Sequence, residues 1–579
     1  MLFGNEGGLT DNDFTDRVRA ALDREVRGIL AETGLSWRAM QHRRLAERIK
    51  TLAAAWRLLG TPAPPRQAAV LLGAAERLAG LLRERQNPGG LFRGGDNIDS
   101  PPDTAAGVND LADAALLLRR AGDPAAGPLA DTLGQLLAAA TPALLTGGVH
   151  TPSHRWELSA ALARLHRLDP RPELAGRAGQ WLAEGVDVED GLYSERSADY
   201  AAHVSNPSLM IIAEVFDRPG LLGHVERNLT ATLDLLLPDG TVETVLSRRQ
   251  DQRGRVRLEA FLLPLRVMAA LRSRPDLAWA AGIALEQGIE SPGTAAAELL
   301  LCPVAGAVLP PSAPPLRPRL RHFRSAGTVV AHGPATTAVV FGGSDYSRHR
   351  RIRSGLANSP TLLRLHAGAA VLDSVRLSRT FFGVGPFRAD GLVLEPGPVA
   401  VMRESVTAAY YQPLAPEDRD EGGRYRLGDD GRFSAAMSFG RRARDEVTLN
   451  TTVRVALREE AMEVVGEGLV EVAVEMSGAT VDWALELAFR PGGTMTGARA
   501  LGSGRWVLEE GPATYRVGGD ELRVTVAEAP GMPAESDPVY HPGEDYEFLG
   551  GTDAVVGELL YVTGKSPSRL RLRIDVAVI

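Results

Sequence analysis

The chain has 579 residues, of which 44% are hydrophobic and 23% are charged, so wholesale disorder is excluded and the length suffices for two or more hydrophobic cores. Its 64 Lys and Arg residues against 72 Asp and Glu residues give a formal net charge of −8, which argues against a nucleic-acid-binding surface. The single cysteine, Cys302, excludes an intrachain disulfide and a cysteine-based zinc cluster.

The first eight residues lack the basic region and the apolar stretch of a signal peptide. Apolar runs such as residues 52–55 are far shorter than the roughly 18 residues that span a bilayer. We therefore expect a cytoplasmic protein with no membrane partner, or a secreted one if a leader has been removed.

From about residue 11 to residue 300, apolar residues recur at three- and four-residue spacing, which predicts a series of amphipathic helices with almost no strand. Residues 71, 74, 75, 78 and 82 form one such apolar stripe. Helices of this length with short Gly- and Pro-containing connections are typical of antiparallel hairpins that form either a solenoid or a closed ring.

Residues 302–320 contain six prolines, which cannot continue a helix and favour an extended backbone. We therefore predict an α-helical domain at residues 1–301, a Pro-rich linker at 302–320 and an antiparallel β-sandwich at 321–579. In the last part the apolar period changes to two, which is typical of half-buried strands. The predicted strands include residues 328–331 and 337–341 as a hairpin, then 447–457, 461–466, 470–476 and 570–578.

The first candidate functional stretch begins at Thr151, which with Pro152 predicts a helix N-terminus. His154 and Arg155 then fall in the first helical turn, where the helix dipole disfavours cations but favours a bound carboxylate. In the alternative interpretation, His154 caps or packs and Arg155 pairs with an acid elsewhere.

A second stretch follows the turn at Asp190-Gly191 and carries two tyrosines, a Glu, an Arg and a His. Because loops at one end of a helical array line clefts, these side chains are candidates for a site. The alternative is a solvated loop whose tyrosines cover apolar neighbours.

Three further clusters are polar enough to bind a ligand. In one interpretation, the guanidinium groups of Arg248 and its neighbours bind a carboxylate through two-point contacts; in the other, these residues form a solvated surface. Asn97 and Asp103 bind hydroxyls, or only cap the following helix. In the β half, the arginines beside His349 favour its neutral form, suited to a base, with simple surface placement as the alternative.

The order of an α-helical half, a Pro-rich link and a β half resembles the heparinase II/III-like polysaccharide lyases, in which an (α/α) toroid precedes a multi-sheet β domain. At residue level the resemblance rests on Ser-His-Arg-Trp at 153–156, on residues 190–200 and on residues 323–328. It implies an N-terminal (α/α) toroid, as an incomplete helical barrel, followed by an antiparallel β-sandwich.

The resemblance also implies a carbon–oxygen lyase that cleaves a uronate-containing glycan by β-elimination. His154 would neutralise the uronate carboxylate, Tyr200 would act as base and acid with Tyr193 as the second choice, and His349 would assist. The candidate substrate-binding residues are Asn97, Asp103, Arg155, Trp156, Glu195, Arg196, Asn206, Arg248, Arg249, Gln250 and Tyr410.

No cofactor is predicted, and the sequence lacks the His-x-His-x-Asp signature that would support a divalent metal in the β domain. The expected partner is an acidic oligosaccharide or polysaccharide; the sequence does not indicate an oligomeric state. One rival interpretation is a glycoside hydrolase on the same kind of toroid that uses Asp103 with Asp190 or Glu195. The other rival is a carbohydrate-binding protein without turnover.

Overall fold

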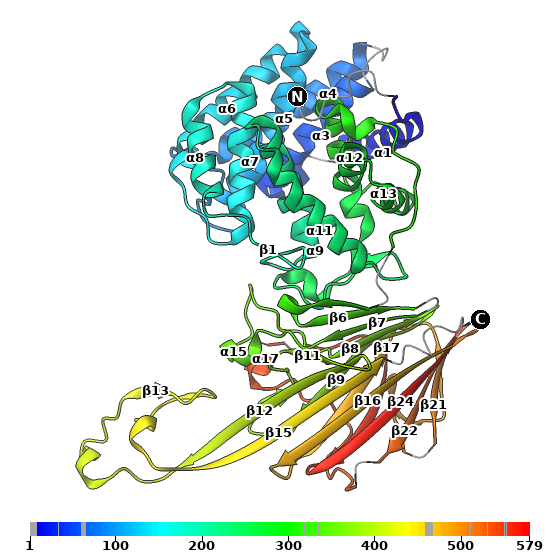
Figure 1. The fold of residues 1–579 in the computed structure, drawn as a ribbon. Coiled ribbons are helices and arrows are strands. Elements are labelled where there is room, and N and C mark those ends of the chain that lie inside the picture. The colour runs from blue at the N-terminus through cyan, green and yellow to red at the C-terminus, as the bar shows by residue number, and fades with distance from the viewer. Residues whose placement is uncertain are drawn as a thin grey trace. The chain divides into compact units, whose positions relative to one another are not determined.

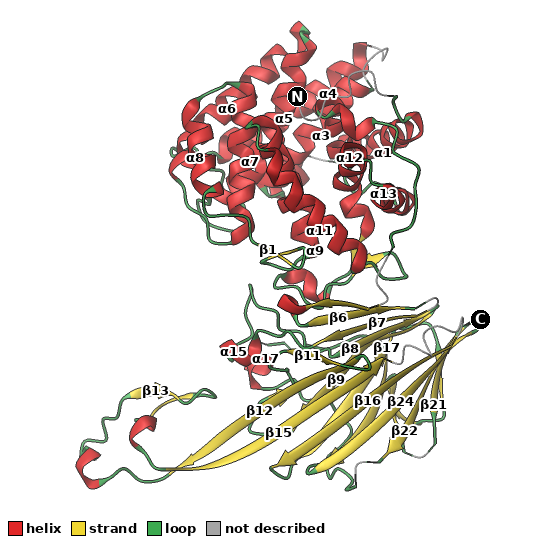
Figure 2. Ribbon diagram, viewed as in Figure 1, coloured by secondary structure: helices red, strands yellow, loops and turns green. Residues whose placement is uncertain are grey.

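The computed structural model describes residues 9–32, 34–59, 65–316, 320–333, 336–457, 467–509, 511–529, 531–548, 550–551 and 553–578. By its contacts the chain divides into two compact units. Unit 1 is helical and unit 2 consists mainly of antiparallel strands, which confirms the predicted fold class (Figures 1 and 2). The N-terminal stretch inspected for a leader and the predicted strand at 461–466 lie outside the described residues.

The boundary between the units falls between Leu316 and Arg317. Residues 302–316 belong to unit 1 and include a 3-10 turn at Pro303–Gly306 that packs against α12 (Leu262–Arg272) and α14 (Pro292–Leu301). Residues 237–239 and 243–255 come from the helical half of the sequence but belong to unit 2. Nothing in their composition indicated this assignment.

Unit 1 is an array of helices with two pairs of two-residue strands. Its helices are α1 (Asn12–Ala31), α2 (Gly34–Ala39), α3 (His42–Leu58), α4 (Pro65–Arg85), α5 (Pro101–Ala121), α6 (Gly127–Thr146), α7 (Pro152–Leu168), α8 (Pro172–Leu182), α9 (Ala198–Tyr200), α10 (Asn206–Val215), α11 (Leu222–Asp234), α12 (Leu262–Arg272), α13 (Pro275–Gln287) and α14 (Pro292–Leu301). The strand pairs are β1 (Val188–Glu189) with β2 (Leu192–Tyr193), and β3 (Thr241–Val242) with β4 (Val256–Arg257). Among the described residues, no helix is long and apolar enough to cross a membrane.

The helix boundaries follow local chemistry. The α5 helix begins where the Ser100 hydroxyl accepts a hydrogen bond from the backbone N–H of Asp103, and it ends at Gly122, whose φ of 63° lies in the left-handed region. The α7 helix begins after Thr151 and carries Pro152 in its first turn, as predicted, although the Thr151 side chain makes no capping hydrogen bond.

The helices of unit 1 close into a ring. The α3 helix packs against α5, α5 against α7, and α7 against α10, while the last helix, α14, packs against α3. Because the first and last of these helices are neighbours, the predicted choice between a solenoid and a closed ring resolves in favour of the ring.

Unit 2 contains two large sheets. Its strands are β5 (Leu320–Phe323), β6 (Thr328–His332), β7 (Thr336–Phe341), β8 (Leu363–Ala367), β9 (Ala370–Arg379), β10 (Gly385–Pro386), β11 (Leu392–Glu395), β12 (Val399–Tyr411), β13 (Leu427–Asp429), β14 (Ser434–Ala436), β15 (Arg444–Leu457), β16 (Glu467–Gly478), β17 (Asp482–Phe489), β18 (Thr494–Thr496), β19 (Arg499–Gly502), β20 (Arg505–Val507), β21 (Ala513–Val517), β22 (Asp520–Glu528), β23 (Glu558–Lys565) and β24 (Ser568–Ala577). The short helices α15 (Tyr346–His349) and α17 (Glu544–Phe548) also belong to this unit.

One sheet has the order β19-β20-β23-β17-β9-β8-β7-β6-β5 and the other has the order β11-β12-β15-β16-β24-β22-β21-β18. One continuous hydrophobic core contains residues of both sheets, as expected for a sandwich. The last strand shows the predicted alternation, with Leu570, Leu572 and Ile574 buried while Arg571 and Arg573 are exposed. The predicted hairpin is β6 paired with β7, although residues 334–335 of its turn are not among those described.

Candidate functional site

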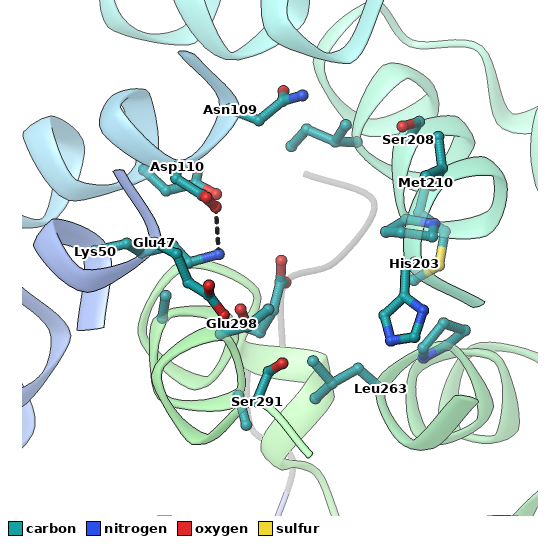
Figure 3. Close-up of a pocket in the computed structure, with 18 of the residues that line it drawn as sticks. Glu47, Lys50, Asn109, Asp110, His203, Ser208, Met210, Leu263, Ser291 and Glu298 are labelled. Atoms are coloured by element: carbon teal, nitrogen blue, oxygen red, sulfur yellow. Dashed lines mark hydrogen bonds and ion pairs between the residues drawn. The ribbon is translucent and has the colours of Figure 1, made fainter. Parts of the chain in front are cut away.

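Unit 1 encloses a cavity of about 510 Å³ (Figure 3). Its lining comes from α3, α5, α7, α10, α12 and α14 and from the segments that precede or follow them. These helices form the inner ring, because α1, α4, α6, α8, α11 and α13 contribute no lining residue. The alternation of inner and outer helices is the arrangement expected of an (α/α) toroid.

The inner helices α3 and α5 run in the same direction. Arg43 pairs with Asp103 near the start of both helices. Lys50, seven residues further along α3, pairs at 2.5 Å with Asp110, seven residues further along α5. Equal steps along both helices require parallel axes.

The same argument extends to α7 and α10. Asn109 of α5 donates to the backbone carbonyl of Glu157 at 3.2 Å, and Asp113, one turn later, pairs with Arg164 of α7 at 2.9 Å. Towards the end of α7, Arg167 lies 3.6 Å from Glu214 at the end of α10. The N-termini of these four inner helices therefore lie at one end of the cavity, which we call the mouth.

Among the described residues, side chains at the mouth are more exposed than those further along the helices. Arg44 near the start of α3 is 66% exposed. By contrast, the Lys50 side chain is 8% exposed, and Cys302 beyond the end of α14 is 5% exposed. A ligand would therefore enter at the helix N-termini, where the helix dipoles favour a negative charge.

The cavity has a charged wall and an apolar wall (Figure 3). Asp113 accepts from both Arg164 and Arg167, at 2.9 and 2.8 Å, and Lys50 donates to Asp110. The opposite wall, from α10 and α12, carries aliphatic side chains such as Met210 and Leu263.

Two lining acids have no hydrogen bond or ion pair of their carboxyl groups within the described part of the chain, namely Glu157 and Glu298. Burial raises the pKa of Glu157 to about 7, an effect that Arg43 opposes and that Asp110 and Glu195 reinforce. Burial and the nearby Asp113 also raise the pKa of Glu298. The sequence analysis missed both, although Glu157 lies three residues after His154 and therefore on the same helix face.

His154, the predicted carboxylate neutraliser, is the third residue of α7 and is 7% exposed. The ring of His150 meets its ring edge-on, with the centroids 4.7 Å apart. One helical turn further, Glu157 lines the cavity. His154 therefore lies at the mouth, as a site residue should, although it is not itself a lining residue.

Arg155, predicted to bind substrate, instead pairs with Glu184 at 2.7 Å and stacks over the ring of Trp156 at 4.6 Å. Trp156 is 3% exposed and belongs to the core. Of the two interpretations of this turn, the structure favours the one in which Arg155 pairs with an acid elsewhere.

Tyr200, the predicted base, is the last residue of α9 and is partly buried. It precedes a π-helical turn at Ala201–Ser205, in which His203 lines the cavity. His203 hydrogen-bonds Asp199 and Glu290, at 3.0 Å each. Burial alone would lower the pKa of His203, but these two carboxylates outweigh it and raise the pKa to about 10, so the ring is cationic near neutral pH.

The structure corrects the predicted roles of Tyr193 and Asn206. The Tyr193 hydroxyl donates to the Asn206 side chain at 2.8 Å, and Asn206 in turn donates to Asn228 at 2.9 Å. Asn206 has no exposed surface, and burial raises the pKa of Tyr193 well above its usual value. Both residues are therefore parts of a buried polar network and not of a ligand-binding surface.

The predicted acids before α5 and after β2 have different surroundings. Asp103 is 1% exposed, pairs with Arg43 and accepts hydrogen bonds from the backbone and side-chain N–H groups of Asn97. Asn97 itself is exposed at the surface. Glu195 is 6% exposed and Arg196 has a φ of 51°. Neither Asp103 nor Glu195 lines the cavity, so the carboxylate pair proposed for a hydrolase is not found there.

The remaining predicted residues belong to unit 2. Arg248, predicted to bind substrate, instead makes a two-point ion pair with the buried Asp345, at 2.8 and 2.9 Å. This corrects the prediction, because the guanidinium is already paired within the protein. Gln250 and His349 are exposed, and Arg249 is partly buried. Tyr410 is 61% exposed on β12, where its ring meets that of Phe382.

Among the described residues, no group of three or more His, Cys, Asp or Glu side chains is arranged to hold a metal ion.

No family model matches the chain. No curated protein matches it either. Among solved structures, the chain is similar to a heparan sulfate lyase from Pedobacter heparinus, with 10% identity and a TM-score of 0.48 over 92% of this chain and 76% of that one. It is also similar to the chondroitin AC lyase of Streptomyces coelicolor A3 in complex with chondroitin sulphate, with 16% identity and a TM-score of 0.49 over 97% and 79% of the two chains. A likeness this distant establishes neither a family nor an activity.

Proposed function

We propose that this protein is a glycan lyase that cleaves a uronate-containing oligosaccharide or polysaccharide by β-elimination. The observation that carries the proposal is that His154 and Tyr200 each adjoin a segment that lines one cavity, at the end where the inner helices begin. This placement supports the roles that the sequence resemblance implies for the two residues.

The mouth suits an anionic substrate group. The N-termini of α3, α5, α7 and α10 direct the positive ends of their dipoles to this end. His154 donates to the uronate carboxylate and, with the helix N-termini, stabilises the negative charge that develops on it when the C5 proton is removed.

Tyr200 acts first as base and then as acid. Its phenolate takes the C5 proton, the electron pair forms the C4–C5 double bond, and the C4–O4 bond breaks. The same phenol then returns a proton to the O4 oxygen of the leaving sugar.

The test uses two tyrosines of the same region. Tyr200→Phe is expected to abolish the unsaturated product, measured by its ultraviolet absorbance on a panel of uronate glycans, without changing thermal stability. Tyr193→Phe removes a buried hydrogen bond and is expected to lower stability by about 1 kcal/mol while the variant keeps the lyase activity. Full activity of Tyr200→Phe on every cleaved glycan would remove this residue from the mechanism.

The pKa of Glu157 favours one other function. A carboxyl that titrates near pH 7 at the mouth suits a general acid, and Glu195 lies within electrostatic reach of it. A hydrolase would therefore use these two acids in place of the predicted Asp103. New reducing ends without unsaturated ends on the same panel would favour hydrolysis.

A further inference from the structure

The acidic side chains of the cavity have no part in the proposed elimination, and the charges of the lining do not balance. Eight acidic side chains line the cavity. Six of them pair with a cationic side chain, and these are Glu47, Asp110, Asp113, Glu214, Glu259 and Glu290. The carboxyl groups of Glu157 and Glu298 have no such partner within the described residues.

The cations near Glu298 are already engaged. Arg164 and Arg167 both donate to Asp113, and Lys50 donates to Asp110. An ionised carboxylate in a poorly hydrated interior is costly unless a cation compensates it. Glu157 and Glu298 feel nearby cations but have no hydrogen bond or ion pair of their own among the described residues, so they mark places where a cationic ligand would be stabilised.

The two acids lie at different depths. Glu157 is in the second turn of α7, and Arg164, which is within electrostatic reach of Glu298, lies seven residues further along the same helix. Seven residues correspond to about 10 Å along a helix axis. A ligand that contacts both acids must therefore be elongated and carry a positive charge at each end.

The wall opposite the charged residues indicates which chemical group links the two positive charges of the ligand. Met210, Ile211, Leu263 and Val267 of α10 and α12 are apolar, with Ser208 and Glu214 as the polar lining residues of the same two helices, and no Phe, Tyr or Trp is among the lining residues described. Aromatic rings are the usual platform for a sugar ring, whereas an aliphatic wall suits a flexible methylene chain. The lining thus favours an alkyl chain over a saccharide in the interior.

We propose that the cavity of unit 1 binds a short linear aliphatic diamine, with one ammonium group on Glu157, the other on Glu298, and the methylene chain against the α10 and α12 wall. This proposal does not depend on the lyase function. Each ammonium makes a charge-assisted hydrogen bond to a carboxylate that lacks one, and the chain buries apolar surface on both sides.

Binding is expected to be coupled to protons. Burial raises the pKa of Glu157 to about 7, so a fraction of this carboxyl is protonated near neutral pH, and burial also raises the pKa of Glu298. An ammonium ion favours the ionised carboxylate, and binding therefore releases protons to the buffer. The affinity rises as the pH increases from 5 to 8.

The experiment is isothermal titration calorimetry of the full chain with 1,5-diaminopentane, 1-aminopentane and 1,5-pentanediol. We expect the diamine to saturate at one molecule per chain at pH 8, and to bind at least tenfold more weakly at pH 5. The monoamine should bind at least tenfold more weakly than the diamine, and the diol should not bind. Titration in two buffers of different ionisation enthalpy should show proton release.

Glu157→Gln and Glu298→Gln should each lower the affinity for the diamine at least tenfold. Glu173→Gln, on the exposed surface of the outer helix α8, should leave this affinity unchanged. Thermal unfolding verifies that each variant is folded, and the wild-type proton release provides a test that needs no variant. The proposal is overturned if the diamine shows no saturable binding, or if the Glu157→Gln/Glu298→Gln double variant binds it as tightly as the wild type. Binding without proton release, or tighter binding of glucosamine than of the diamine, would also overturn it.

Discussion

The two units bury their charged side chains in different ways. In unit 2, Arg376 lies between Glu486 at 2.7 Å and Asp553 at 3.1 Å and stacks on the ring of Tyr540, and all of these groups are enclosed. In unit 1, the buried charges surround a cavity, and two of its carboxyl groups have no hydrogen bond or ion pair within the described part of the chain. The comparison indicates that a fully paired buried charge contributes to the fold, whereas an unpaired one beside a cavity marks a ligand position.

The largest expected effect lies in unit 2. Arg376→Met leaves Glu486 buried without its cation and leaves Asp553 with Arg388 alone, 3.6 Å away, which should lower the free energy of unfolding by about 3–5 kcal/mol. Chemical denaturation measures the loss. The matched control is Arg569→Ala on the outer face of β24, where the side chain is 71% exposed and the ion pair with Glu475 should contribute less than about 1 kcal/mol.

Equal losses for the two arginine variants would break the comparison, because the enclosed network would then contribute no more than a surface pair. A large loss for Arg376→Met alone would support it.

A smaller effect is expected for the buried amide network of unit 1. Asn206→Ala removes the acceptor of the Tyr193 hydroxyl and the donor to Asn228, so it should cost about 1–3 kcal/mol. The measurement is again the free energy of unfolding. If Asn206→Ala instead weakened glycan binding with no loss of stability, the predicted role of Asn206 in substrate binding would be restored.

The sequence was most informative where a pattern is local. Three- and four-residue spacing predicted the helices, and alternation predicted the last strand, with Leu570 and Leu572 inward and Arg571 outward. Pro152 after Thr151 predicted the start of α7 to the residue. These features depend on neighbours within a few residues, which a single sequence contains.

The site depends on contacts between distant segments, which local patterns do not contain. The pairing of Arg248 with Asp345 and the assignment of residues 243–255 to unit 2 follow from contacts across about a hundred residues. The cavity exists because helices far apart in the sequence run parallel, and this direction cannot be read from periodicity. Of the two cavity acids that were not predicted, only Glu157 could have been found from the sequence, because it shares a helix face with His154.

A weaker and pH-dependent effect is expected at the cavity itself. Because the folded pKa of Glu157 is raised to about 7, the protonated form stabilises the fold, and that stability is lost as the pH rises from about 4.5 through 7. Glu157→Gln should therefore be more stable than the wild type at pH 8 and equal to it at pH 4. A variant that is less stable at pH 8 would show that the carboxylate has a structural partner, and the contrast with unit 2 would disappear.

The smallest effect is expected at His203, which is partly exposed at the mouth. Its two carboxylate partners raise its folded pKa to about 10, so the stability it contributes is fully present below its unfolded pKa near 6.5 and is lost as the pH rises through 10. His203→Gln should be less stable than the wild type at pH 6, with the difference closing by pH 10.5, as measured by thermal unfolding across this range. A difference that stays constant with pH would mean that His203 acts through packing alone. A difference that closes would mean that a fully paired cation stabilises the mouth, in contrast to Glu157 and Glu298, for which no ion pair is found among the described residues.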